Sequence, residues 1–569
     1  MKIYINILIL LPALILSCGH ALAQEKVFVH SDRDIYVAGE DMLFSLFIHQ
    51  SNDNSHSSNV AYIELININN TAVAQSRIGT TDAYGHGVLP IPDSLTTGRY
   101  LLRAYTRVMR NYGQGIFFTK SIIIYNPFKE NVNAAQVDSI IQPVVGKAAQ
   151  TERSTNISCQ GTIATRFPTR EKVTLSFRVD TSAFTDPQVC NISVSVAVSA
   201  GDNGDSEISS IFQEDRGGFN ITGTNYYLYP EFAGTYLDGS VVSRDSRESV
   251  QGKRLYLSDP GKNPFFQYSE TDNRGNFNFL LPPFIGSREL IIQPSDFNND
   301  HIIKTLSSFA EPQAVSQMTK AGLPVELLDY ASRLGVNYQV NKIYELENGG
   351  PSVITGPDSI NYRFYGQPEV EVYLDDYIDL PTMEEVFHEL VPGVALRGRA
   401  GDASFVFTSE PGSPPLEGPD AVFLDGVLLD DHSFIALLDP DLIERIDVIR
   451  NPYQVGRIIF NGLISIVTKE GDMCGIDYPE TGLRTSLDFP DRDYAYENFT
   501  YDGSSQADPL LPDFRNTLYW DPGIKPDNKG IIEFTFYTSD FLSDYLITIN
   551  GITDSHQALM FSKRISVVR

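Results

Sequence analysis

The side chains that do most enzyme chemistry are scattered along this sequence. Histidines such as His30, His86, His301, His388 and His432 stand far apart, with no His-x-x-x-His pair and no Cys-x-x-Cys spacing for a metal ion. No Gly-x-Ser-x-Gly nucleophile elbow and no Gly-x-x-x-x-Gly-Lys phosphate loop occurs. The sequence therefore predicts a protein that is not an enzyme and that uses no metal and no cofactor.

Acidic pairs such as Asp375–Asp376 and Asp430–Asp431 do not change this interpretation. The chain has 72 acidic and 43 basic residues, so paired carboxylates are expected at many places without a catalytic role. His388 beside Glu389 is typical of a solvated helix face. Asp32 to Asp34 are interpreted as a polar turn, since a metal with oxygen ligands needs about six of them. The net charge of −29 disfavours nucleic acid and anionic membrane surfaces as partners.

The first residues form a targeting segment. Lys2 precedes an apolar run, and the small residues of Ala21-Leu22-Ala23 predict cleavage after Ala23, which leaves Gln24 as the mature N-terminus. The alternative is a lipobox that ends at Cys18, which would acylate this cysteine and anchor the protein to a membrane. No later stretch reaches the ~18 apolar residues of a membrane helix. We expect an exported protein that meets a membrane only by association or through a lipid anchor.

Two cysteines lie in one strand-rich region. Cys159 and Cys190 could form a disulfide in an oxidising compartment, worth about 3–4 kcal/mol for a loop of this length. The other interpretation is two buried thiols, and the sequence leaves both open.

The sequence from Lys26 to Phe128 predicts β-strands. "YLLRAYTRV" alternates with period two, and turn signals such as "DAYGHG" separate the strands, which indicates a β-sandwich. The words "VFVHSDRDIYVAGED", "TDAYGHGVLPIPDSLTTGRYLLRAYT" and "VMRNYG" resemble macroglobulin-type domains of exported Gram-negative proteins. "KVTLSFRVD" and "VCNISVSVAVS" are similar to the next such domain. "TDNRGNFNF" resembles a carboxypeptidase regulatory-like domain, a small sandwich without catalytic groups.

The later half of the chain has a different pattern. Helical spacing over 312–335, with Pro324 opening or breaking the helix, predicts a connector that packs two domains together. "LPTMEEVFHELVPGVALR" predicts a short amphipathic helix and then a strand, and Asp425-Gly426 in "FLDGV" predicts a hairpin turn. In their order and spacing, "VPGV", "FLDGV", "IERIDVIRNP" and "GLISIVTK" resemble the plug of a TonB-dependent receptor.

The resemblance to a receptor stops after Asp472. About a hundred residues remain, fewer than half of what a barrel of 22 strands of ~10 residues needs. The turn from Asn451 to Asn461 also lacks the small residues usual in receptor plugs. It carries Tyr453, Ile458, Ile459 and Phe460, which we interpret as candidate contacts to a partner. The alternative is that they cover a neighbouring domain of the same chain.

The predicted fold class is mainly β, with tandem immunoglobulin-like β-sandwiches and a small α/β plug-like domain. The expected organisation is a signal peptide (1–23), a macroglobulin-like sandwich (24–128), a second one (158–230), a carboxypeptidase regulatory-like sandwich (231–300), a helical connector (310–345), the plug-like domain (368–472) and a C-terminal sandwich (490–569).

Together these resemblances imply a non-catalytic scaffold or adaptor of a Gram-negative cell envelope, in the periplasm or associated with the outer membrane. Its partner would be an outer-membrane or periplasmic protein, a β-barrel among the candidates. The alternative is an extracytoplasmic binding protein for peptide or glycan in nutrient uptake, acting through loops or edge strands.

Overall fold

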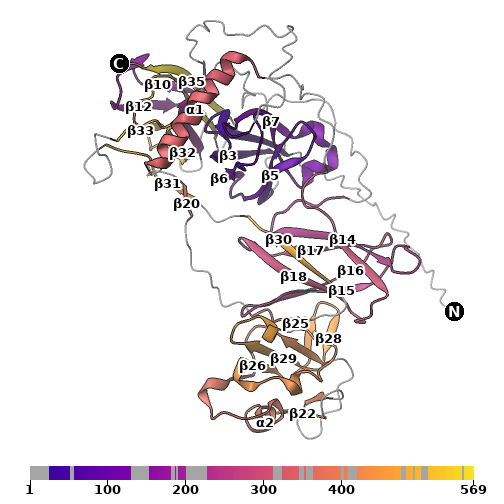
Figure 1. Cartoon of the computed structure of the whole chain (residues 1–569). Helices are drawn as coiled ribbons and strands as arrows, with labels where there is room; N and C mark the ends of the chain where they lie inside the picture. Colours follow the sequence, from indigo (N-terminus) through magenta and orange to yellow (C-terminus); the bar gives the residue numbers. More distant parts are fainter. Residues whose placement is uncertain are drawn as a thin grey trace, which may run out of the picture.

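The fold is mainly β, as the sequence predicts, with many small sheets stacked along the molecule (Figure 1). The computed structural model describes residues 25–50, 57–129, 153–180, 186, 190–199, 227–311, 323–344, 351–353, 363–398, 403–407, 420–475, 482–490, 494–501, 511–553 and 557–569. The predicted signal peptide with Cys18, Ala23 and Gln24 lies outside these residues, and so does 312–322 of the predicted helix.

The first sandwich, residues 25–129, packs two sheets face to face. One sheet has the order β1 (Glu25–Ser31), β3 (Asp41–Gln50), β6 (Tyr84–Pro90). The other has the order β2 (Ile35–Val37), β8 (Phe118–Tyr125), β7 (Gly98–Thr106), β4 (Val60–Ile66), β5 (Ala72–Gly79). Phe44, Leu46, Tyr62 and Leu102 fill the core between them. Alternating side chains direct one face of each strand inward, which is the arrangement that a sandwich requires.

The second sandwich joins two distant parts of the chain. One sheet contains β10 (Ile157–Cys159), β12 (Lys172–Val179) and β33 (Ile531–Tyr537). The other has the order β11 (Arg166–Phe167), β35 (Ala558–Val567), β34 (Asp544–Ile552), β13 (Asn191–Val198), β32 (Thr517–Ile524), and β9 (Arg153–Thr155) pairs with β35. β13 therefore has a C-terminal strand on each side, β34 and β32.

The prediction of two separate sandwiches, 158–230 and 490–569, is wrong. Phe177 stacks on Phe534 at a centroid distance of 5.8 Å and meets Phe561 edge-on at 4.7 Å, so the two parts share one core. The few strands described between 153 and 199 have too little apolar surface to enclose a core, and the C-terminal strands supply the rest. The sequence of a strand shows which of its faces is apolar, but it does not identify the strand that pairs with it.

The third unit also takes a strand from far along the chain. Its sheets are β17 (Asn276–Leu281), β14 (Thr235–Ser243), β19 (His301–Thr305), and β16 (Phe265–Glu270), β15 (Arg254–Asp259), β18 (Ser287–Pro294), β30 (Leu483–Asp488). The predicted boundary at residue 300 is too early, because β19 pairs with β14. β30 returns after the whole α/β module to pair with β18. A further short pair joins β20 (Pro351–Val353) to β31 (Tyr494–Tyr496).

Helix α1 (Val325–Ile343) begins directly after Pro324, which therefore opens the helix. It packs Ala331 and Leu334 into the core of the second sandwich and lies against β2 and β8 of the first. The close approach needs Gly335, since a Cβ there would lie 2.9 Å from the Tyr125 ring. Helix α1 thus contacts both sandwiches.

The α/β module, residues 363–475, has one five-stranded sheet. Its order is β21 (Val370–Tyr373), β26 (Ile443–Ile449), β29 (Leu463–Thr468), β24 (Ala421–Leu424), β25 (Val427–Leu428). Helix α2 (Met383–Glu389) is capped by Thr382 and buries Met383, Val386 and Phe387. Two small hairpins complete it, β22 (Val394–Arg397) with β23 (Ser404–Phe407) and β27 (Tyr453–Val455) with β28 (Ile458–Phe460). The 3-10 turn η8 (Pro440–Leu442) directly precedes β26.

The predicted turn at Asp425-Gly426 joins β24 to β25. Both residues have positive φ, 46° and 85°, as this tight hairpin turn requires. The buried Asp425 carboxylate accepts hydrogen bonds from the Thr468 backbone and hydroxyl at 2.7 and 2.6 Å and from Met473 N at 2.8 Å. The hairpin is thereby tied to the end of β29.

Candidate functional site

The predicted contact turn is the hairpin β27–β28, and two of its four candidate side chains, Ile458 and Phe460, are buried. Phe460 is 1% and Ile458 6% exposed, whereas Ile459 between them is 56% exposed. The Tyr453 ring is half-buried and its hydroxyl donates to the Phe364 carbonyl at 3.1 Å. Ile458 and Phe460 pack with Tyr256 and Phe266 of the third unit. The proposal that Ile458 and Phe460 contact a partner is therefore wrong, because alternation along β28 turns both into the chain's own interior.

This hairpin belongs to an aromatic joint between the third unit and the α/β module. The Phe266 ring lies edge-on to Phe423 at 4.9 Å, and Phe364 meets Phe423 at 5.0 Å. Pro264 packs so closely on Gly426 that a Cβ on this glycine would collide with it. Tyr268 Oη accepts a hydrogen bond from the Arg457 backbone at 3.0 Å. Such interlocked rings hold the module in one orientation.

A different part of the module exposes large apolar side chains. Tyr373 ends β21, and Tyr377 and Ile378 follow the 3-10 turn η6 (Leu374–Asp376). Leu437 ends the 3-10 turn η7 (Ile435–Leu437), and Leu442 ends η8. Their exposed fractions are 38, 50, 81, 70 and 46%, in chain order. We call these five residues the apolar patch; nothing in the sequence pattern singled them out.

Two of the segments that carry the patch, those of η6 and η8, meet at Lys469. Its backbone N–H donates to the Leu442 carbonyl at 2.9 Å, and its Nζ lies 2.8 Å from Asp375 Oδ1. The hydrogen bond with Asp375, and the charges of Asp375, Asp441 and Asp379, raise the pKa of Lys469. Tyr373 pairs with Arg445 across the sheet, and the Arg445 guanidinium lies 5.7 Å from the Tyr373 ring centroid. Tyr373 and Leu442 therefore lie near each other, where β21 pairs with the start of β26, and η7 with Leu437 packs against α2.

The rim of the patch is acidic. Its exposed carboxylates are Asp375, Asp376, Asp379, Asp439 and Asp441. No Lys or Arg occurs between residues 364 and 396 or between 430 and 442. Lys469 is held by Asp375, so its charge is already matched. Exposed apolar side chains with carboxylates beside them are typical of a protein contact surface.

Beneath β21 the module buries a charged cluster. Asp447 accepts from Tyr365 Oη at 2.6 Å and from Arg445 Nε at 3.0 Å, and Arg363 Nε lies 3.6 Å away. Asp447 is 0% exposed and Arg445 and Tyr365 are each 5% exposed. Burial, with the Asp447 charge, raises the pKa of Tyr365, so the phenol stays protonated. The cluster attaches the 363–369 segment to the sheet.

The other residues singled out from the sequence take structural places. Cys159 and Cys190 are not joined by a disulfide; Cys159 pairs with Phe177 in one sheet, and Cys190 precedes β13 in the other. The Cys190 thiol donates to the Asp186 carbonyl at 3.8 Å. His388 lies 2.9 Å from Glu389 on the exposed face of α2. Within the described residues no group of His, Cys, Asp and Glu could hold a metal ion.

The Asp32 turn lies between the two sandwiches. Asp32 accepts from Tyr36 Oη and from Thr517 Oγ1, both at 2.7 Å, and Arg33 pairs with Glu40 at 3.1 Å. Next to it, the buried His30 ring contacts Ser193 Oγ at 2.6 Å and Thr548 Oγ1 at 2.8 Å. A cavity of about 90 Å³ lies at this junction. The turn joins domains, a role that the sequence did not reveal.

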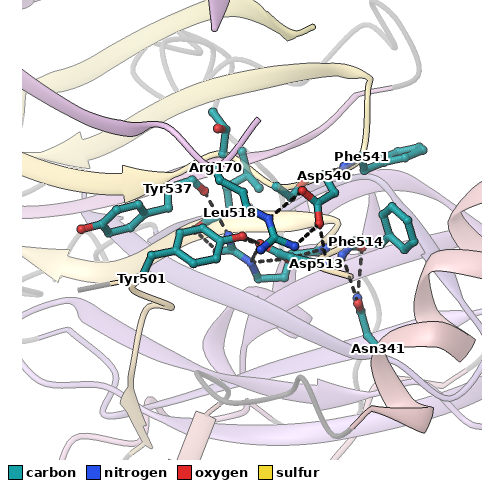
Figure 2. A network of polar contacts seen from close by, with 12 residues as sticks. Arg170, Asn341, Tyr501, Asp513, Phe514, Leu518, Tyr537, Asp540 and Phe541 are labelled. Atoms are coloured by element: carbon teal, nitrogen blue, oxygen red, sulfur yellow. Dashed lines mark hydrogen bonds and ion pairs between the residues drawn. The ribbon is translucent and has the colours of Figure 1, made fainter. Parts of the chain in front are cut away.

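Figure 2 shows a second joint, at α1. Arg170 donates to Asp540 at 2.8 and 2.6 Å, and Asp540 accepts from the Asp513 backbone at 2.9 Å. Tyr501 Oη donates to Asp513 at 2.6 Å, and Asn341 of α1 donates to the Phe514 carbonyl at 3.0 Å. Burial acts to raise the pKa of Asp540, but its hydrogen bonds, that from Arg170 first, lower it overall. The network attaches helix α1 and the 511–516 segment to the second sandwich.

No family model and no curated protein sequence matches the chain. Among solved structures, a mutant of Salmonella alpha-2-macroglobulin aligns at 9% identity and a TM-score of 0.23, over 96% of this chain and 39% of that one. Escherichia coli alpha-2-macroglobulin activated by porcine elastase aligns at 9% identity and 0.24, over 96 and 44%. The D0-D1 domain of Intimin gives 12% and 0.14, over 48 and 93%. At these TM-scores the likenesses carry no argument, so the fold class rests on the strands themselves.

This chain thus spans less than half the length of the macroglobulins it aligns with. None of the helices in its described part is long and apolar enough to cross a membrane.

Proposed function

We propose that the protein is a non-catalytic scaffold of the cell envelope that presents its α/β module to another protein. The aromatic joint carries this proposal. The hairpin β27–β28 packs against the third unit and holds the module to it. The apolar patch lies on other segments of the module and is exposed. A rigidly held module loses little conformational entropy when its exposed apolar surface binds a partner.

The sequence resemblances support the same function. "FLDGV", "IERIDVIRNP" and "GLISIVTK", which resemble a receptor plug, form β24–β25, β26 and β29 of one sheet. We infer an extracytoplasmic location from the apolar N-terminal segment, and an outer-membrane or periplasmic protein as the partner, with a β-barrel among the candidates.

The test is chemical cross-linking of the full chain in an envelope extract, followed by gentle recovery and mass spectrometry. We expect an envelope protein that is cross-linked to residues 363–475. Cross-links confined to the two sandwiches, or no specific protein, would contradict a presenting role for the module.

A second function, binding of an extended peptide, is favoured by a groove beside β16. Phe266 to Glu270 form one wall of the groove, and Val455 and Arg457 of the hairpin form the other. β16 pairs only with β15 among the described strands, so its outer backbone groups face the groove. A peptide-array hit that is lost on Glu270→Pro, with no envelope protein recovered, would support this function over the first.

A further inference from the structure

We propose that the apolar patch docks a basic, amphipathic segment of a partner protein. This inference rests on the proposed function, since it names the partner chemistry of the same module. Tyr373, Tyr377, Ile378, Leu437 and Leu442 would form the contact, and the carboxylates around them would select the charge of the partner.

The exposure of the patch is the first argument. Single exposed apolar side chains are common on soluble proteins, whereas several on adjoining segments mark a contact surface. Ile378 and Leu437 are 81 and 70% exposed, although the neighbouring Leu374, Leu380 and Leu438 pack against the module core. The local sequence therefore has enough leucines to fill the core and keeps these side chains outside it.

The charge of the rim is the second argument. Asp376, Asp379, Asp439 and Asp441 are exposed on the segments that carry the patch, and Lys469 is held by Asp375. A partner with Lys or Arg beside its apolar residues would match both parts of the surface and would be steered to it. An anionic membrane surface would be repelled.

The same charges argue against a second copy of this chain as the occupant. A two-fold symmetric contact places the same patch on both sides of the interface. The acidic rims would then face each other, and each Lys469 is already paired within its own chain. The patch also lies on segments other than the hairpin β27–β28, so an occupant would leave the aromatic joint intact.

The test uses the full chain and three synthetic 18-residue helical peptides, one of Lys and Leu, one of Glu and Leu, and one of Lys and Ser. We expect fluorescence anisotropy to show binding of the Lys/Leu peptide alone, weakening as salt is raised. Ile378→Ser with Leu442→Ser should weaken it at least about tenfold, as loss of central apolar contacts does. Asp376→Asn with Asp379→Asn should weaken it less and flatten the salt dependence.

Matched controls are Ile68→Ser with Val336→Ser, exposed apolar residues elsewhere, and Asp245→Asn with Glu248→Gln, exposed acids of the third unit. Both should bind like the unaltered chain. Equal binding by the Ile378/Leu442 variant, binding of the Glu/Leu peptide, or self-association that this variant abolishes would overturn the inference. If an envelope protein cross-links to the module at another face, only this inference fails; if none cross-links to the module, the proposed function fails.

Discussion

Arg107 Nη2 donates to both carboxylate oxygens of Asp238, at 2.8 and 2.6 Å, across the joint between the first sandwich and the third unit. Its Nη1 donates to the Tyr229 carbonyl at 2.6 Å, and the guanidinium lies 4.3 Å from the Tyr236 ring centroid. Side chains of the pair are only 3 and 10% exposed. Burial of these two charges costs desolvation free energy, which only the interaction with the oppositely charged partner offsets.

Arg107→Ala should therefore destabilise this joint strongly. Removal of one partner of a buried pair costs about 3–5 kcal/mol, because the remaining carboxylate stays buried. Arg254→Ala is the matched control, since Arg254 and Glu270 form an exposed pair, worth at most about 1 kcal/mol. Urea unfolding followed by circular dichroism should place the first midpoint of Arg107→Ala well below that of the control; equal midpoints would contradict this account.

Glu231 should make the same joint sensitive to rising pH. It accepts from Tyr62 Oη at 2.8 Å and from Tyr236 N at 2.9 Å, and burial raises its pKa to about 7. A carboxyl whose folded pKa lies above its unfolded value favours the fold at low pH. This contribution is complete below about pH 4.5 and is lost as the pH rises through 7. Glu231→Gln should remove up to about 3 kcal/mol of this pH dependence; identical slopes for both proteins would refute it.

His30 should make the joint between the two sandwiches sensitive to acid. Burial, with the Lys120 charge, lowers the pKa of His30 to about 3. Because the unfolded chain takes up this proton near 6.5, stability is lost as the pH falls from 6.5 toward 3. Trp520, the single tryptophan, lies 5.5 Å from the His30 ring and reports on this joint. His30→Gln should delay the acid shift of Trp520 emission to lower pH; an unchanged midpoint would exclude His30 as the cause.

Phe265 and Phe266 are neighbours on β16 with different roles. Phe265 lies in the core of the third unit, whereas Phe266 lies in the aromatic joint to the α/β module. Each change to Ala should cost about 3–5 kcal/mol. Phe266→Ala should let the module melt apart from the third unit in calorimetry, whereas Phe265→Ala should lower the transition of the third unit itself. The same thermogram for both variants would show that the joint does not hold the module.

Truncation after Pro490 should unfold the second sandwich. The shortened chain lacks β32 to β35, so β13 loses both neighbours and β12 loses one. Residues 153–199 should then become accessible to protease, and adding residues 491–569 as a separate chain should protect them again. Resistance of 153–199 in the truncated chain would show that this part folds alone.

Local elements were the most predictable part of the fold. Pro324 opens α1, Asp425-Gly426 turns a hairpin, and Met383, Val386 and Phe387 form the buried face of α2. Each depends on the chemistry of a few adjacent residues: a fixed φ, a left-handed turn, or an apolar period of 3.6. The candidate site was less predictable. The sequence showed four side chains that are unusual for a turn, Tyr453, Ile458, Ile459 and Phe460. It did not show which of them face the interior and which face solvent.

The sequence by itself determined the mainly β fold class, the approximate positions of strands and turns, and the acidic net charge. Only the tertiary structure decided which strands are neighbours. β13 pairs with β34 and β32, and β18 pairs with β30, across separations that no local pattern encodes. The physical reason is that alternation marks the apolar face of a strand, whereas its partner is chosen by the core that both must close. The same reason places Phe460 inside the molecule and its neighbour Ile459 on the surface.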